Sequence, residues 1–239
     1  MEISFSDSVA FVAGGTGGLG RAVSLAFLSE GATVVVTYRK QEEFASLQAS
    51  AGSLTAKLEG HLVDVTDEVA VASCIDAVAS RHGKISALVN TVGAYAGGAS
   101  VWDLDRATFD RLVALNLSSG YALAHAVLPG MLHQKRGSIV NVVAKAAVDH
   151  AAGASAYAAS KAGALALMDS VAADVKGTGV RVNSILPSII DTEVNRKAMP
   201  GANFALWPKP EDIAKVILFL CSDDAKVVHG AAISVYGDS

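Results

Sequence analysis

The chain has 239 residues, of which 51% are hydrophobic and 18% charged, and its formal net charge at pH 7 is −4. This amount of apolar material supplies a large core and excludes an extended disordered scaffold. The negative net charge, with no run of Lys and Arg, argues against nucleic acid and anionic membranes as partners.

Short β-branched runs alternate along the chain with longer segments of helical period. The predicted strands are residues 9–13, 33–38, 61–64, 87–90, 138–143, 181–186 and 231–235. The helical segments lie near residues 18–30, 41–56, 67–82, 105–134, 154–176 and 211–221. Repeated strand–helix units with strands apolar on both faces predict an α/β fold of Rossmann type. We expect a doubly wound, seven-stranded parallel sheet with helices on both faces, forming a single domain over residues 1–239.

The first predicted strand ends in a glycine-rich turn. Gly14, Gly18 and Gly20 have the spacing G-x-x-x-G-x-G, and a helix follows directly. In this pattern the glycines allow a tight turn, a close approach of the backbone to a pyrophosphate, and close helix packing, while helix N–H groups face the anion. A plain strand-to-helix connection can have the same composition, but the position after the first strand favours a phosphate site that includes Thr16 and Leu19.

The end of the second predicted strand bears on which dinucleotide binds. An acid about 20 residues after the glycine turn would bind a ribose 2′-hydroxyl. Here Tyr38 stands at that place, followed by Arg39 and Lys40, two cations that can pair with a 2′-phosphate. The sequence therefore predicts NADPH as the cofactor, with NADH as an alternative; two ordinary solvated charges are the other interpretation.

A phenol and an ammonium stand four residues apart at Tyr157 and Lys161, inside a predicted helix. This spacing places both side chains on one helix face. We expect the ammonium to lower the pKa of the Tyr157 phenol and so make it a usable acid.

Together these features resemble the short-chain dehydrogenase/reductase family over essentially the whole chain. The matching residues are the glycine turn, Asp64-Val65, the Asn90 to Gly93 segment, Asn116, Tyr157, Lys161, Pro187, Ile190 and Thr192. The resemblance implies an NAD(P)H-dependent oxidoreductase in which Asp64 touches the adenine and Asn90 supports the sheet. It also implies a proton relay of Tyr157, Lys161 and Asn116, in which Lys161 holds the ribose and Asn116 orders a water chain.

One position departs from that family in a way that matters for chemistry. The family's catalytic Ser lies thirteen residues before the Tyr, where this chain has Ala144. Loss of such a hydrogen-bond donor typically lowers kcat by about a hundred- to a thousandfold when an oxyanion develops. Neither Ser155 nor Ser160 is expected to replace it, so ordinary ketone and alcohol chemistry is placed in doubt.

A narrower resemblance accounts for the missing hydroxyl. Residues 144–149, 93–98 and 191–207 are similar to the dihydropteridine reductases, members of the family that work without the Ser. Those enzymes have an acid in place of Tyr38 and lack the Asn read at Asn116. The resemblance implies reduction of a quinonoid dihydropteridine to a tetrahydropteridine. Ala144, Tyr95 and Trp207 would then line the substrate site under a lid of residues 191–208, with both aromatic rings placed to stack on the flat heterocycle.

Other functions stay open from the sequence. A short-chain reductase of another carbonyl, quinone, enone or imine is one alternative, and a non-catalytic NADP-binding sensor is another. A mere binder needs no proton relay, so the presence of Tyr157, Lys161 and Asn116 favours an enzyme.

The remaining features concern assembly and location. The helices near 105–134 and 154–176 are apolar all round, which predicts a homodimer or homotetramer. Cys74 and Cys221 lie far apart without His at ligand spacing, so we expect neither disulfides nor a metal site. No basic leader precedes the first strand, and we expect a cytoplasmic protein acting on a small molecule.

Overall fold

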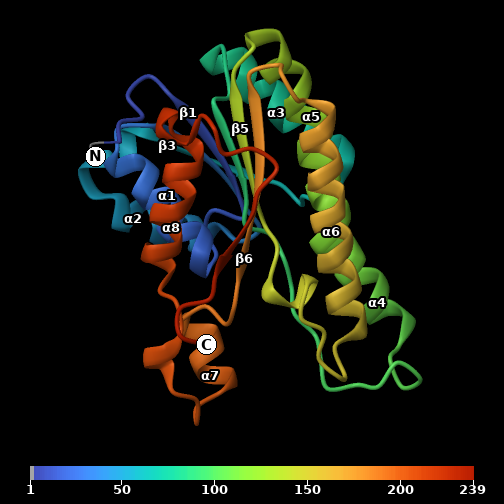
Figure 1. The fold of residues 1–239 in the computed structure, drawn as a ribbon. Helices are drawn as coiled ribbons and strands as arrows, with labels where there is room; N and C mark the ends of the chain where they lie inside the picture. The colour runs from blue at the N-terminus through green and yellow to red at the C-terminus, as the bar shows by residue number, and fades with distance from the viewer. Residues whose placement is uncertain (1–2) are drawn as a thin grey trace.

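The computed structural model of the protein describes residues 3–239, which form one sheet with helices on both of its faces (Figure 1). All strand pairs are parallel, and the seven strands have the order β3-β2-β1-β4-β5-β6-β7. The strands are β1 Val9–Ala13, β2 Thr33–Tyr38, β3 Leu58–Leu62, β4 Ala87–Asn90, β5 Gly137–Val142, β6 Val180–Pro187 and β7 Ala232–Val235. The predicted doubly wound parallel fold is confirmed.

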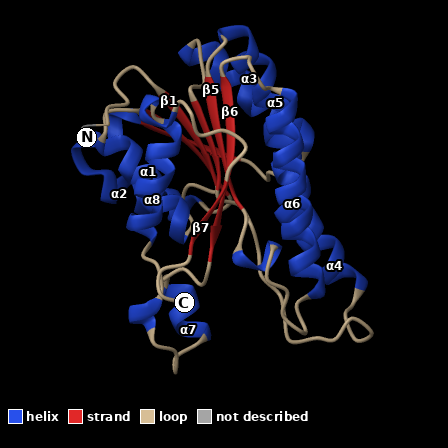
Figure 2. Ribbon diagram, in the orientation of Figure 1, coloured by secondary structure: helices blue, strands red, loops and turns tan. Residues whose placement is uncertain are grey.

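Apart from α7, which lies beyond the end of the sheet, the helices form one layer on each face of the sheet (Figure 2). The bounds are α1 Gly18–Ser29, α2 Gln41–Ala51, α3 Glu68–His82, α4 Arg106–Val113, α5 Ser119–Gln134, α6 Ser155–Asp174, α7 Glu193–Ala198 and α8 Pro210–Cys221. Helices α1, α2 and α8 enclose one apolar core against the sheet, and α3, α5 and α6 enclose the other. Every residue of β1, β4 and β5 is buried, as expected for strands covered on both sides.

The strand order determines where a ligand can bind. From β1 the chain moves outward to β2 and β3, then returns to place β4 on the other side of β1. The loops after β1 and β4 therefore leave in opposite directions and open a crevice at the carboxyl ends of the strands. The glycine turn follows β1, and the Asn90 to Gly93 segment begins at the last residue of β4.

Two predicted elements have a bound that differs from the structure by three residues or more. β3 begins at Leu58 rather than at His61, because Glu59 and Gly60 pair with β2 although neither is a typical strand residue. Gly60 is required here, since a Cβ would enter the ring of Phe44. The predicted helix 41–56 ends at Ala51, because Gly52 has φ +55° and the chain continues as a short 3-10 helix.

The lid segment contains a short helix that its sequence pattern did not predict. α7 spans Glu193–Ala198, and a 3-10 turn covers Phe204–Leu206. The Thr192 hydroxyl accepts a hydrogen bond from the Asn195 backbone N–H and caps α7. The lid is therefore a segment with regular structure after β6 rather than an irregular loop.

The continuous helical run Arg106–Gln134 is apolar enough and long enough to span a membrane, with a mean hydropathy of 1.3 in its most apolar window. In this fold, however, 44% of that window is buried, and α5 packs against α3 in the layer that covers the sheet. A covering helix of a Rossmann-type domain meets the same length and composition criteria, so the run is accounted for without a membrane.

Candidate active site

The glycine turn is packed so closely that side chains are excluded. Gly14 has φ +72°, and a Cβ on Gly20 would collide with the Gly14 carbonyl oxygen. The N-terminus of α1 has no side-chain cap and no acid in its first turn. Its backbone N–H groups are therefore free to face an anion, which fits the pyrophosphate of a dinucleotide.

A cavity of about 300 Å³ continues from this turn across the carboxyl ends of β1, β2 and β4. Its lining includes these predicted cofactor residues: Gly14, Thr16, Arg39, Asp64, Val65 and Gly93. Asp64 accepts hydrogen bonds from the backbone and hydroxyl of Thr66, and these bonds lower the pKa of its carboxyl. The cavity and its polar rim fit the adenosine part of NAD(P)H.

The other predicted cofactor residues do not line this cavity. Gly18 faces the lid, because a Cβ there would lie 2.8 Å from Thr192 Cγ2. Leu19 is buried in the first turn of α1. Pro187 ends β6, and the carbonyl of Ile190 accepts a hydrogen bond from the Asn195 side chain at 2.8 Å.

Of the two cations predicted to bind a 2′-phosphate, Arg39 and Lys40, only one lines the cavity. Arg39 is exposed and lines the cavity, whereas Lys40 is outside the lining and its Nζ lies 3.6 Å from Glu43 Oε1. Arg39 is therefore the cation of the pair that faces the cavity.

Asn116 lies in a one-turn π-helix, Ala114–Ser118, between α4 and α5. Its side chain accepts from the Ala94 N–H at 2.9 Å and donates to the Ala94 carbonyl and to Ser160 Oγ, both at 3.0 Å. These three hydrogen bonds tie the loop after β4 to α6 through Asn116. A π-turn at such a point is typical of functional sites. The expectation that Asn116 orders a water chain stays a prediction.

Ser160 completes this connection and was not predicted as a site residue. Its hydroxyl donates to the Tyr157 carbonyl at 2.9 Å and accepts from Asn116. The position of Ser160 within the Tyr-x-x-x-Lys motif was visible in the sequence, but its partner 44 residues away was not. This commitment leaves Ser160 unable to replace the missing catalytic hydroxyl.

The two central residues of the relay have shifted acidities. Burial raises the pKa of Tyr157 to about 12, with the neighbouring Tyr95 as the second cause. Burial lowers the pKa of Lys161 to about 8, and its Nζ donates to the Val142 carbonyl at 3.0 Å. The prediction that the ammonium lowers the pKa of Tyr157 is wrong for this structure, because desolvation dominates.

Gly93 brings the loop after β4 against the relay. A Cβ on Gly93 would lie 2.9 Å from Asn116 Oδ1 and 3.0 Å from Lys161 Nζ. Asn90 holds the start of this loop against the sheet, because its side chain donates to Asn141 Oδ1 at 2.9 Å and accepts from the Val92 N–H. Asn90 thus supports the sheet as expected.

Ala144 follows β5 and is 7% exposed. Its methyl group offers no hydrogen bond, and Lys145 beside it places its ammonium over the Tyr236 ring at 5.1 Å. Ser155, at the start of α6, is exposed. The site therefore has the phenol of Tyr157, while Ala144 supplies no hydroxyl to polarise a substrate oxygen.

The two predicted substrate aromatics lie in different surroundings. Tyr95 is 68% exposed, and its ring packs edge-on against Tyr157 with centroids 5.0 Å apart. Trp207 is 7% exposed and packs against Phe204 with centroids 5.0 Å apart. Packing inside the lid accounts for Trp207, so its expected stacking on a substrate is corrected, whereas Tyr95 remains available at the mouth of the site.

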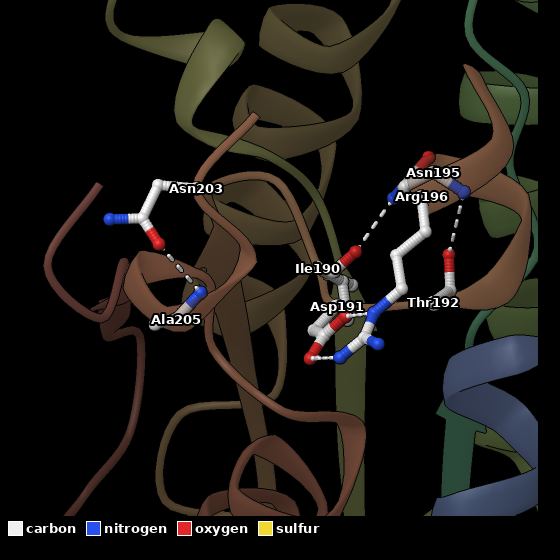
Figure 3. A network of polar contacts seen from close by, with 7 residues as sticks. All are labelled: Ile190, Asp191, Thr192, Asn195, Arg196, Asn203 and Ala205. Atoms are coloured by element: carbon white, nitrogen blue, oxygen red, sulfur yellow. Dashed lines mark hydrogen bonds and ion pairs between the residues drawn. The ribbon is translucent and has the colours of Figure 1, made fainter. Parts of the chain in front are cut away.

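The lid is held by its own polar network (Figure 3). Arg196 forms a two-pronged ion pair with Asp191 at 2.5 and 2.8 Å, and its guanidinium lies 5.0 Å from the Phe204 ring centre. The Arg196 hydrogen bond is the main cause that lowers the pKa of Asp191. Near its start, the lid contacts the glycine turn through Thr192 and Gly18. Arg196 joins two parts of the lid, Asp191 and Phe204.

One polar cluster outside this cleft was also missed. Glu59 on β3 accepts from His61 at 2.7 Å and from His82 at 3.0 Å, with Arg81 at 3.4 Å. Burial alone would raise the pKa of Glu59, but the two histidine hydrogen bonds and the Arg81 charge lower it. Within residues 3–239, no group of three or more His, Cys, Asp or Glu side chains is arranged to hold a metal ion.

Comparison with known proteins defines the class. The short chain dehydrogenase family matches residues 8–203. The 3-oxoacyl-(acyl-carrier-protein) reductase FabG of Thermotoga maritima is 32% identical over 237 residues, which is 96% of each chain. The chain therefore belongs to the short-chain dehydrogenase/reductase family and is an oxidoreductase of that family.

Solved structures agree in fold. A short-chain type dehydrogenase/reductase from Mycobacterium ulcerans has a TM-score of 0.93 at 27% identity, covering 99% of this chain and 90% of its own. An NAD+-bound xylitol dehydrogenase has a TM-score of 0.90 at 26% identity, covering 98% of this chain and 99% of its own. The names of these three proteins do not refer to a pteridine.

Proposed function

We propose that this chain is an NADPH-dependent reductase of an activated conjugated acceptor, with a quinonoid dihydropteridine as substrate and a tetrahydropteridine as product. The proposal treats residues 1–239 as one cytoplasmic catalytic domain with a lid over residues 191–208. NADH is the alternative cofactor.

The observation that carries the proposal is the buried methyl group of Ala144. A ketone or alcohol reaction develops negative charge on oxygen, and a nearby hydroxyl donor normally stabilises it. Ala144 cannot donate, and Ser160 is committed to Tyr157 and Asn116. An acceptor with an electrophilic conjugated C=N bond spreads the arriving charge and needs no such donor.

Bound reduced nicotinamide would supply the hydride in this reaction. The chain's own residues supply the proton and hold the geometry. With its pKa raised to about 12, Tyr157 is protonated at neutral pH and acts as an acid, passing its phenolic proton to a nitrogen of the acceptor. One hydride and one proton together convert the dihydro form to the tetrahydro form.

Lys161 and Asn116 position that acid. Lys161 is buried beside Gly93 and held by the Val142 carbonyl, at the point where a cofactor ribose would meet the loop after β4. Asn116 holds the Ala94 backbone and, through Ser160, the Tyr157 backbone. The relatives support the hydride-transfer class of the reaction; the pteridine rests on the Ala144 argument and on the resemblance of the lid.

The direct test is NADPH oxidation with freshly generated quinonoid dihydropteridine against a panel of ketones, quinones, enones and imines. We expect kcat/KM for the pteridine to exceed that for the ketones by at least about a hundredfold, the cost of a missing donor. Equal or faster ketone reduction would overturn the proposal. A sensor would bind NADPH and turn over none of these substrates.

We also propose that the chain works as a homodimer or homotetramer joined through α5 and α6. On α5, Tyr121 is 46% exposed and Leu132 is 39% exposed, apolar surface that a second copy would cover. Light scattering coupled to size-exclusion chromatography measures the mass. A monomer at micromolar concentration would contradict this expectation.

A further inference from the structure

The charged lining of the adenosine cavity contains an acid that the family resemblance did not single out. The charged side chains at its wall are Arg39, Glu43, Asp64 and Arg111. Arg39 and Arg111 suit a phosphate, and Asp64 is expected at the adenine. Glu43 has no place in that assignment, because it comes from the first turn of α2 rather than from a strand end.

Glu43 is held in the cavity wall by two contacts. Its Oε2 accepts a hydrogen bond from the Thr16 hydroxyl at 3.2 Å, and its Oε1 lies 3.6 Å from Lys40 Nζ. The side chain is 42% exposed. The carboxylate therefore bridges Thr16 of the glycine turn and Lys40, and it lines the same cavity as Arg39.

The corner before α2 keeps the acid in this place. The Tyr38 hydroxyl donates to Gln41 Oε1 at 2.7 Å, and the Tyr38 ring stacks on Phe44 with centroids 4.8 Å apart and an interplanar angle of 2°. These two contacts join the end of β2 to the first turn of α2 and so fix the position of the helix turn that carries Glu43.

We propose that Glu43 is a specificity residue that weakens binding of a 2′-phosphorylated adenosine and makes the chain accept NADH as well as NADPH. This inference rests on the proposed function, since it assumes that the cavity binds the cofactor's adenosine. A 2′-phosphate near Arg39 would meet the negative charge of Glu43, and Lys40 would have its charge partly compensated by the same carboxylate. A ribose 2′-hydroxyl, in contrast, can donate a hydrogen bond to that carboxylate.

The test uses cofactor fragments, so that binding is measured without turnover. Isothermal titration compares adenosine 2′,5′-bisphosphate with 5′-AMP on the wild type and on Glu43→Gln. The ratio of the two Kd values should shift toward the bisphosphate by about tenfold in Glu43→Gln, the size expected for removing one like charge at contact distance. A ratio that stays within about twofold of wild type would overturn the inference.

Matched variants separate the charge in the cavity from other effects. Glu42→Gln removes a neighbouring acid from the same helix turn, but Glu42 is exposed and does not line the cavity. It should leave the ratio unchanged, and an equal shift in Glu42→Gln would assign the effect to the helix terminus and overturn the inference. Glu43→Asp keeps the charge and should stay near the wild-type ratio.

The result also distinguishes this inference from the proposed function. If the wild type binds the bisphosphate more tightly than 5′-AMP and Glu43→Gln has the same ratio, only the role of Glu43 fails. If the wild type binds neither fragment, the proposed NADPH site fails together with it. Thermal unfolding of each variant, monitored by circular dichroism, verifies that it is folded.

Discussion

The two halves of the cleft are built in different ways. The cofactor half consists mainly of backbone: Gly14, Gly18 and Gly20 shape the turn, and the uncapped N-terminus of α1 offers N–H groups. The acceptor half consists of side chains, with Tyr157 and Tyr95 in contact and the methyl of Ala144 where the family has a hydroxyl. The difference teaches that backbone geometry identifies the family, whereas the proposal about the acceptor depends on a few side chains.

Removal of the proton donor tests the acceptor half and has the largest expected effect. Tyr157→Phe keeps the ring and its contact with Tyr95 but has no acidic proton. We expect kcat for the pteridine to fall by about 10²- to 10⁴-fold, the usual contribution of a positioned acid. The Kd of NADPH should change little, since the cofactor half is untouched. Unchanged turnover would contradict the acid role of Tyr157.

A methyl group added to Gly18 tests whether the contact between the glycine turn and the lid matters for cofactor binding. In Gly18→Ala the new Cβ would lie 2.8 Å from Thr192 Cγ2, so the lid or the turn must shift. We expect KM for NADPH to rise by about tenfold, comparable to the cost of a strained contact. Steady-state kinetics at varied NADPH measures the change.

The partner variant of this experiment is Thr192→Ser, which removes Cγ2 and keeps the hydroxyl that caps α7. Combined with Gly18→Ala, it should restore much of the lost affinity, because the two residues are in contact and their effects are not additive. Strict additivity of the two changes would show that the lid does not rest on the glycine turn.

The alkaline limb of the pH profile tests the contact inside the acceptor half. Tyr157 must be protonated to donate, so activity persists below its pKa and falls above it. Burial and Tyr95 raise this pKa to about 12, so the phenol stays protonated well above neutral pH, whereas Lys161, whose pKa burial lowers to about 8, loses its charge within that range. Tyr95→Phe removes one cause and should move the alkaline limb to lower pH, with less than about a twofold change in kcat at neutral pH. If the alkaline limb did not move, Tyr95 would have no effect on the pKa of Tyr157.

Much of the fold was predictable because its signals are local. Buried β-branched runs and glycine spacing located the sheet and the turn after β1. β3 was misplaced because Glu59 and Gly60 are unlike strand residues, although both pair with β2 and Gly60 lies against the Phe44 ring. The helix α7 was missed because its stability comes from the cap of Thr192 and from lid contacts rather than from an apolar period.

Tyr157, Lys161 and Asn116 were predicted as site residues from spacing and resemblance, and their catalytic roles stay predictions. The contacts of these residues were less predictable than their identities. The hydrogen bonds of Asn116 to Ala94 and to Ser160 join residues 22 and 44 positions apart, and no local pattern records them. The burial of Trp207 depends on the folding of the lid around it. The direction of the Tyr157 pKa shift was wrong for the same reason, since desolvation depends on the whole surroundings of the phenol.

Ala144→Ser tests the central claim most directly, because it restores to the acceptor half the hydroxyl found elsewhere in the family. The measurement is kcat/KM of wild type and variant with the quinonoid dihydropteridine and with a ketone. If the acceptor needs no polarising donor, pteridine reduction stays within a few-fold of wild type, and any gain, up to about a hundredfold, falls on the ketone. A hundredfold gain with the pteridine would contradict the account.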